Sequence, residues 1–132
     1  MAKILIIDDE RAIRGSLKEI LEYEKYQADE AEDGEDGLKK LSKEKYDIAL
    51  LDIKMPNMDG MEVLQKAVES GVDTQFIMIS AHGNIETAVE ATKLGAFDFI
   101  EKPPDLNRLL VTVKNALDKS DLVAETKVLR KK

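Results

Sequence analysis

The chain has 132 residues, 43% of them hydrophobic, and its 27 acidic and 20 basic residues leave a formal net charge of −7. This length and apolar content suit one globular domain and exclude global disorder, while the absence of cysteine excludes disulfides, thiolate metal sites and a thiol nucleophile. The single histidine excludes any site with two histidine ligands, and the acid surplus argues against direct nucleic-acid binding through charge.

Short apolar runs alternate along the chain with longer amphipathic segments. The apolar runs are Ile4–Ile7, Ile48–Leu51, Phe76–Ile79 and Phe97–Ile100, with a weaker candidate at Gln27–Ala31. Nearly continuous runs of branched residues are typical of strands buried on both faces of a parallel sheet. The first run is too short for a signal-peptide core or a membrane span, so we expect a cytoplasmic protein with no membrane contact.

Apolar residues at helical spacing follow each run and predict five helices. In chain order, the apolar positions are Ile13, Leu17, Ile20 and Leu21, then Leu38 and Leu41, then Val63, Leu64, Ala67 and Val68, then Ile85, Ala88, Val89 and Thr92, and finally Leu106, Leu109, Leu110, Val113 and Leu117. Asp59 and Asp105 stand at the positions of helix N-caps, and Gly95 stands where the fourth helix would end.

This alternation of strand and helix predicts an α/β fold. Right-handed crossovers and five βα units favour a flavodoxin-like (βα)5 three-layer sandwich with a parallel sheet in the order 2-1-3-4-5. We expect this domain to cover residues 1–118. Residues 119–132 contain neither glycine nor proline, so the last helix could continue as a helical extension. A frayed end and a short dimerising coil or linker are equal alternatives for this segment.

The residues that end the predicted strands carry the chemistry. Asp8 and Asp9 follow the first strand, Asp52 ends the third, Ser80 ends the fourth and Lys102 follows the fifth. Because ligands of open α/β sheets bind beyond the carboxyl ends of the strands, we expect these side chains to converge. Clustered carboxylates repel one another unless a cation or a shared proton relieves them, and oxygen-only ligands favour Mg²⁺. Each residue alone has an ordinary alternative as a cap, turn or surface charge, but together they favour phosphoryl chemistry.

Three segments resemble the receiver domain of two-component response regulators (CheY-like). They are Ile6–Glu10, Leu50–Gly60 and Lys102-Pro103, and the resemblance covers residues 3 to about 118. It implies a phosphorelay protein in which Asp52 is the phosphoacceptor for a phosphohistidine on a sensor histidine kinase. Such a domain is not an enzyme beyond its own phosphotransfer and autodephosphorylation.

The resemblance also implies a Mg²⁺ site. Asp9 and Asp52 would bind the ion directly, the backbone carbonyl of Lys54 would be a third ligand, and Asp8 would contact the ion mainly through water. Lys54 and His82 would tune the lifetime of the phosphoryl group. An exposed loop position is the simpler interpretation of the His82 side chain.

A conformational switch belongs to the same resemblance. Ser80 would bond a phosphoryl oxygen, Lys102 would pair with the phosphoryl group, and the peptide bond from Lys102 to Pro103 would be cis. As Ser80 moves, the ring of Phe99 would turn inward and change the surface of the fourth helix, fifth strand and fifth helix. A static aromatic side chain is the alternative for Phe99.

Residues 80–103 resemble the receivers of sigma-54-dependent transcription activators. In those proteins an AAA+ ATPase and a DNA-binding domain follow, so residues 119–132 would be a linker toward output domains that this chain does not include. The resemblance also suggests a homodimer through the fourth and fifth helices or the C-terminal helix. One departure is Pro104, because such receivers usually have phenylalanine after the Lys-Pro pair.

Three other functions compete with this interpretation. A standalone receiver that acts by docking is the nearest alternative, and the tail beyond the fifth helix argues against it. An aspartate-nucleophile phosphatase would need an Asp-x-Asp motif, whereas Asp52 is followed by Ile-Lys. A dinucleotide-binding domain would need a glycine-rich loop after the first strand, where Asp8-Asp9-Glu10 would repel a pyrophosphate.

Overall fold

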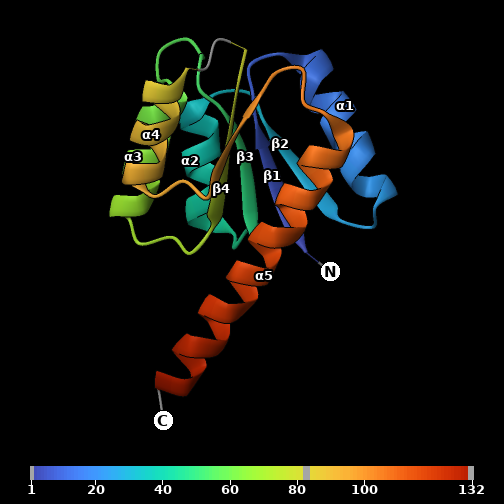
Figure 1. Cartoon of the computed structure of the whole chain (residues 1–132). Helices are drawn as coiled ribbons and strands as arrows, with labels where there is room; N and C mark the ends of the chain where they lie inside the picture. The colour runs from blue at the N-terminus through green and yellow to red at the C-terminus, as the bar shows by residue number, and fades with distance from the viewer. Residues whose placement is uncertain (1, 82–83, 131–132) are drawn as a thin grey trace.

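A parallel sheet forms the middle layer of this computed structural model, which describes residues 2–81 and 84–130, with side chains as far as Leu122. Its five strands lie in the order β2-β1-β3-β4-β5, which confirms the predicted topology. The strands are β1 (Lys3–Ile7), β2 (Gln27–Ala31), β3 (Ile48–Asp52), β4 (Gln75–Ser80) and β5 (Asp98–Glu101). All neighbouring pairs are parallel, so every strand ends at the same edge of the sheet (Figure 1).

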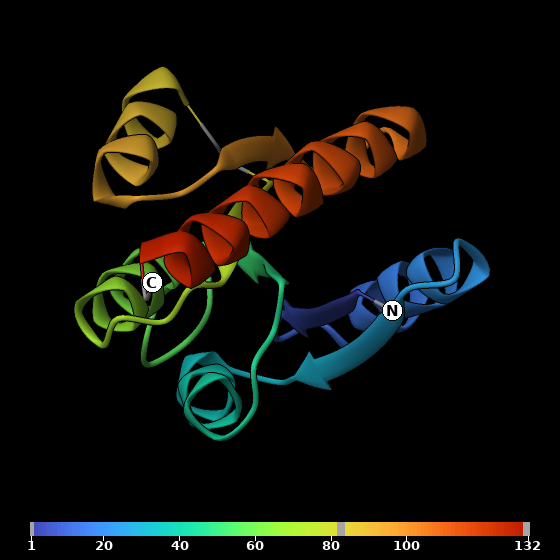
Figure 2. The same ribbon diagram turned by 90° about the horizontal axis from the view of Figure 1, so that it is seen from below.

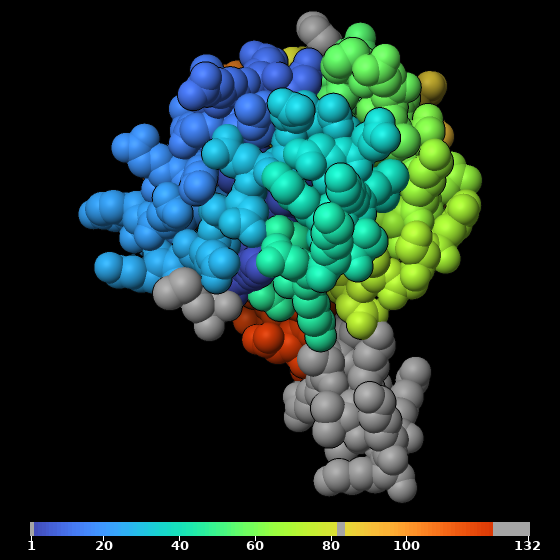
Figure 3. All heavy atoms as spheres, turned by 180° about the vertical axis from the view of Figure 1, so that it is seen from behind, coloured from blue at the N-terminus to red at the C-terminus, as the bar shows by residue number. Residues whose placement is uncertain are grey.

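Five helices cover the two faces of the sheet. They are α1 (Arg11–Tyr23), α2 (Gly34–Lys43), α3 (Gly60–Glu69), α4 (Ile85–Leu94) and α5 (Leu106–Arg130). Seen from below, α1 and α5 lie on one side of the sheet and α2, α3 and α4 lie on the other (Figure 2). The view from behind shows α2 and α3 side by side over their face (Figure 3). The predicted three-layer sandwich is therefore confirmed.

Helix ends follow local sequence signals. Asp59 accepts a hydrogen bond from the Glu62 amide at 2.9 Å, and Asp105 accepts one from the Arg108 amide at 3.0 Å. These bonds satisfy amides that the first turn of a helix leaves without partners. Gly95 ends α4 with φ of 116°, a left-handed conformation that glycine adopts at little cost.

Alternate residues of β1 face opposite cores. Leu5 and Ile7 pack with side chains of α2, α3 and α4, whereas Ile4 and Ile6 pack with those of α1 and α5. All four side chains are fully buried. Burial of an Ile or Leu side chain contributes about 1.5–3 kcal/mol, so the central strands hold both outer layers in place.

The apolar face predicted for α4 is partly wrong. Ile85 and Val89 are 83% and 45% exposed, whereas Ala91 is buried. Ala88, with Ala91 three residues on, lies on the side toward the domain. The reason is the position of α4, which packs mainly against α3 and the edge strand β5 and needs a narrow stripe of small residues. In β5 itself the ladder begins at Asp98, one residue later than predicted.

The last helix is longer than the sheet is tall. It runs unbroken from Leu106 to Arg130, and its second half extends beyond the amino end of the sheet (Figure 1). Leu109, Val113 and Ala116 anchor its first half in the core. Across residues 2–81 and 84–130, no helix has both the length and the apolar character needed to cross a bilayer.

Candidate functional site

The carboxyl edge of the sheet gathers the predicted site residues. Asp8 directly follows β1, and Asp52 and Ser80 end β3 and β4. Ile7 pairs with Leu51, which places Asp8 and Asp52 at the same level on neighbouring strands. The exposed fractions of Asp8, Asp52 and Ser80 are only 3%, 5% and 3%. Three polar side chains are therefore buried at one end of an apolar sheet.

Lys102 connects the two buried aspartates. Its ammonium nitrogen lies 2.8 Å from Asp8 Oδ2 and 3.3 Å from Asp52 Oδ1, and the side chain is 10% exposed. The backbone amide of Lys102 donates to the Ser80 carbonyl at 2.9 Å, which fixes the turn after β5 against β4. The peptide bond between Lys102 and Pro103 is cis. One cation therefore stands between two buried carboxylates.

Asp8 has both carboxylate oxygens engaged by protein groups. Oδ1 accepts from the Glu10 amide at 2.8 Å, and Oδ2 accepts from Lys102. Asp9 and Glu10 are exposed, and one ligand oxygen from each of Asp8, Asp9 and Glu10 lies within 4.8 Å of the others. Glu10 was not a predicted ligand, although it is the third acid of the Asp-Asp-Glu segment. Asp52 is not one of this trio.

Electrostatics at this edge favour a bound cation. Burial, together with the charge of Asp8, raises the pKa of Asp52 to about 6, and Lys102 opposes both effects. Burial alone would lower the pKa of Lys102, but the hydrogen bond to Asp8 and the charge of Asp52 outweigh it, so the pKa is raised. At neutral pH Asp52 is mostly ionised, and its carboxylate is available as a nucleophile.

The loop after Asp52 is closely packed. The Gly60 amide donates to the Ile53 carbonyl at 2.8 Å, so α3 begins directly against the end of β3. A Cβ atom on Gly60 would lie 2.2 Å from the Asp52 carbonyl oxygen, which no side chain could tolerate without moving the strand end. Lys54 is exposed in the turn between them, and Asn57 adopts a left-handed φ of 70°. The backbone around Lys54 is therefore tied to the position of Asp52.

The remaining predicted residues lie around this edge. Phe99 is half-buried on β5 and packs against the core cluster shared by α2, α3 and α4. His82 lies outside the described residues. Pro104 lines an apolar cavity of about 310 Å³ between α1 and the turn after β5, together with Ile13 and Leu17. The departure at Pro104 therefore falls beside the site, next to Lys102.

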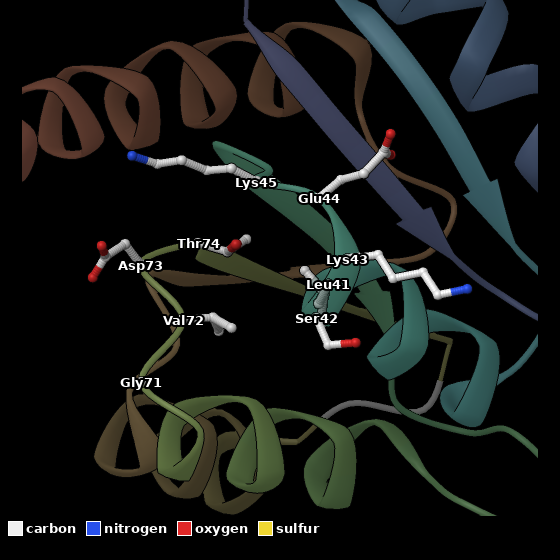
Figure 4. A pocket seen from close by; sticks show the side chains of 9 residues that line it. All are labelled: Leu41, Ser42, Lys43, Glu44, Lys45, Gly71, Val72, Asp73 and Thr74. Carbon is white, nitrogen blue, oxygen red and sulfur yellow. The ribbon is translucent and has the colours of Figure 1, made fainter.

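A second hollow lies at the opposite end of the sheet. It has a volume of about 350 Å³ and is lined by the connections from α2 to β3 and from α3 to β4 (Figure 4). Lys43, Lys45 and Asp73 point outward from it (Figure 4). None of the predicted site residues lines this hollow, so the carboxyl edge is the candidate site.

Comparisons with known proteins show which family the chain resembles. Residues 4–114 match the family described as the response regulator receiver domain. The nitrogen assimilation regulatory protein NtrX of Azorhizobium caulinodans is 41% identical over 129 residues, which are 96% of this chain and 28% of that protein. The C4-dicarboxylate transport transcriptional regulatory protein DctD of Rhizobium meliloti is 34% identical over 128 residues, which are 97% of this chain and 28% of that protein.

Solved structures show the same architecture. A CheY-like response regulator receiver domain protein from Methanospirillum hungatei has a TM-score of 0.87 and 37% identity, covering 92% of this chain and 97% of that one. NtrX from Brucella abortus has a TM-score of 0.89 and 38% identity, covering 98% of this chain and 30% of that one. The chain spans under a third of the curated relatives it matches. It belongs to the response regulator receiver domain family, the phosphoacceptor module of two-component systems.

Proposed function

We propose that Asp52 is the phosphoacceptor of this receiver domain. The observation that carries the proposal is the buried arrangement of Asp52, Lys102 and Asp8 at the carboxyl edge of the sheet. An oxygen of Asp52 attacks the phosphorus of a phosphohistidine on a sensor histidine kinase. The new O–P bond forms as the P–N bond breaks, and the imidazole leaves with the electron pair. Lys102 stands where it can pair with the negative oxygens of the transferred group.

The acidic edge fits Mg²⁺. Its donors are carboxylate oxygens with no histidine or cysteine among the described residues of the cluster, which is the ligand chemistry that this ion prefers. We assign Asp9, Asp52 and the Lys54 carbonyl as direct ligands and Asp8 as a ligand through water. When bound, the ion neutralises charge on the phosphoryl oxygens. Glu10 is close enough to contribute a further oxygen.

Phosphorylation would then act through Ser80 and Phe99. Ser80 is buried at the end of β4, beside β5, and can donate its hydroxyl to a phosphoryl oxygen. Phe99 is half-buried, so an inward movement of its ring would deepen its burial without hiding a polar group. The changed surface comprises α4, β5 and α5. Lys54 and His82 tune the lifetime of the acyl phosphate.

The receiver controls output domains in this proposal. Residues 1–118 form the receiver, and residues 119–132 form a helical linker toward an AAA+ ATPase and a DNA-binding domain of a sigma-54-dependent activator in the cytoplasm. Two facts support this context: the relatives NtrX and DctD are named as regulatory proteins, and the chain matches 28% of each. The receiver itself does not contact nucleic acid.

Labelling with acetyl phosphate tests the acceptor. Wild-type protein with Mg²⁺ should gain one phosphoryl group, seen by intact mass spectrometry, and Asp52→Asn should gain none. Asp59→Asn is a matched control, because Asp59 lies on the loop beyond Asp52 and asparagine keeps its capping role. Labelling of Asp52→Asn at the wild-type rate would overturn the assignment.

A second experiment addresses dimerisation through α4 and α5 or through the extension of α5. Light scattering of the protein with and without beryllofluoride should show a dimer in at least one state. A monomer in both states would contradict this part of the proposal.

A further inference from the structure

Arg14 lies behind the turn that carries the acidic cluster. From the first turns of α1, its Nη1 donates to the backbone carbonyl of Asp8 at 2.7 Å, and its Nε donates to Glu30 Oε1 at 3.1 Å. The side chain is 13% exposed. The guanidinium therefore bridges a main-chain carbonyl of the site and a carboxylate on β2.

Glu30 is itself held by other elements. It lies on β2 opposite Ile6 of β1, and its backbone carbonyl accepts a hydrogen bond from Lys40 of α2. Its carboxylate also faces Lys18 at 4.0 Å. The backbone of the residue that accepts from Arg14 is consequently held by the sheet and by a second helix.

The bond to Asp8 has a direct geometric consequence. The carbonyl of Asp8 and the amide of Asp9 belong to one planar peptide unit, so fixing that oxygen fixes the direction in which the chain enters Asp9. The carboxylate of Asp8 itself accepts hydrogen bonds from Lys102 and from the Glu10 amide. The main chain of Asp9, whose side chain is exposed, therefore starts from a peptide plane that Arg14 holds.

We propose that Arg14 is a positioning residue for the cation site, and that Glu30 supports it. Arginine suits this role because its planar fork can donate to two acceptors at once in a fixed geometry, whereas lysine offers one compact ammonium group. The proposal rests on the Mg²⁺ site proposed above, and the experiment separates the two.

The charge of Arg14 makes the test discriminating. Removal of a positive charge beside acidic ligands should strengthen Mg²⁺ binding if only long-range electrostatics matters. Loss of a positioning residue should weaken it, because groups that orient metal ligands change affinity by about 10–100-fold when removed. The two explanations for Arg14→Gln therefore predict changes of opposite sign.

The measurement is the Mg²⁺ dissociation constant of the unphosphorylated protein, followed by NMR titration. Arg14→Gln should raise the constant about tenfold, and the ¹³C chemical shift of the Asp8 carbonyl should change in the metal-free protein. Glu30→Gln should also raise the Mg²⁺ dissociation constant and shift the Asp8 carbonyl signal in the same direction, but less strongly. Lys18→Gln is the matched control, because it removes a charge from the same helix that faces the same carboxylate without touching Asp8. The Mg²⁺ dissociation constant and the Asp8 carbonyl shift of Lys18→Gln should stay at wild-type values.

The other outcomes separate the role of Arg14 from the existence of the Mg²⁺ site. Unchanged or tighter Mg²⁺ binding by Arg14→Gln, with normal binding by the wild type, would overturn the role of Arg14 alone. Failure of the wild type to bind Mg²⁺ would overturn the proposed metal site and this inference with it. If Arg14→Gln does not fold, Arg14→Lys takes its place. Wild-type affinity for Mg²⁺ in that variant would show that the planar guanidinium group is not required.

Discussion

Both ends of the sheet gather carboxylates around one lysine, but they differ in exposure. At the carboxyl edge, Asp8 and Asp52 are buried around Lys102, whose side chain is 10% exposed. At the amino edge, the corresponding cation is Lys3, and its partners Asp29 and Glu44 are 36% and 52% exposed. Water can therefore screen the amino-edge charges, whereas the carboxyl-edge charges act on one another at low dielectric.

Hydrogen bonds at the amino edge come from Tyr46 and from the main chain. The hydroxyl of Tyr46 lies 2.8 Å from Asp29 and 2.9 Å from Glu44, and the Lys3 amide donates to Asp47 at 2.9 Å. The Lys3 ammonium stands 4.9 Å from the centre of the Tyr46 ring. Burial and the two carboxylate acceptors raise the pKa of Tyr46, so its hydroxyl stays a donor at physiological pH.

Similar residue types therefore serve two purposes at the two edges. The partly exposed cluster joins β1, β2 and the residue that follows α2 at the amino end of the fold. The buried cluster keeps Asp52 at a raised pKa, so ionisation of the metal-free site costs stability and a bound cation relieves that cost. Variants at the two edges should therefore behave differently, and four of them test this.

The largest effect is expected from Lys102→Met. It leaves two buried carboxylates without their cation, and breaking a buried ion pair costs about 3 kcal/mol of unfolding free energy. Urea denaturation at pH 8 in EDTA measures the loss, which should shrink near pH 5 as Asp52 takes up a proton. Lys54→Met is the matched control, because Lys54 is exposed beside the site. A loss below about 1 kcal/mol would contradict the strong coupling described here.

The next effect is a gain in stability from Asp52→Asn. Because burial raises the pKa of Asp52 from 3.8 to about 6, the folded state binds the proton more tightly than the unfolded state. The free energy of unfolding therefore falls as the pH rises from about 4 to above 6, and each tenfold difference in proton affinity between the two states contributes about 1.4 kcal/mol. In EDTA at pH 8 the variant should be up to about 3 kcal/mol more stable than the wild type, with little difference near pH 4.

The same comparison of stability can be repeated with added Mg²⁺. Millimolar Mg²⁺ should stabilise the wild type more than Asp52→Asn, and so narrow the gap between them. A gap that does not depend on pH would show that the substitution acts through packing and not through the buried charge.

Tyr46→Phe should have a smaller effect at the amino edge. It removes one hydroxyl bonded to carboxylates, so we expect a loss of about 1 kcal/mol in unfolding free energy. Mg²⁺ affinity and labelling by acetyl phosphate should stay at wild-type values. A change in either would mean that the two edges are energetically coupled.

Lys3→Gln should give the smallest change. Its carboxylate partners are well exposed, and exposed ion pairs contribute little to stability. Thermal denaturation should show a slight loss that disappears at about 1 M salt, where charges are screened within a few ångströms. A loss that persists at high salt would point to the contact with the Tyr46 ring instead.

Topology and the residues of the acidic edge were predictable from the sequence because both depend on local patterns. The branched runs Ile4–Ile7 and Ile48–Leu51 predict buried strands, and the polar residues that follow them mark the carboxyl edge. Distances within the edge were not predictable. The pairing of Lys102 with Asp8 joins residues 94 positions apart, and only the folded sheet brings them together.

Two errors of the sequence interpretation have physical causes. On α4 the periodicity favours burial of the more hydrophobic stripe, with Ile85 and Val89, although an edge helix can pack through small residues such as Ala91. The contacts of Arg14 are not predictable from the sequence, because a basic residue on an amphipathic helix is usually solvated. One acceptor, Glu30, lies on another strand, so no local pattern reveals the pair.

The projecting half of α5 has a practical consequence for the design of reporters. The acidic edge and this half of the helix lie at opposite poles of the molecule (Figure 1). A fluorophore placed on the solvent side of α5 near residue 120 would be remote from Asp52. A change in its signal would therefore report an event at the far pole of the molecule and not direct contact with the acidic edge.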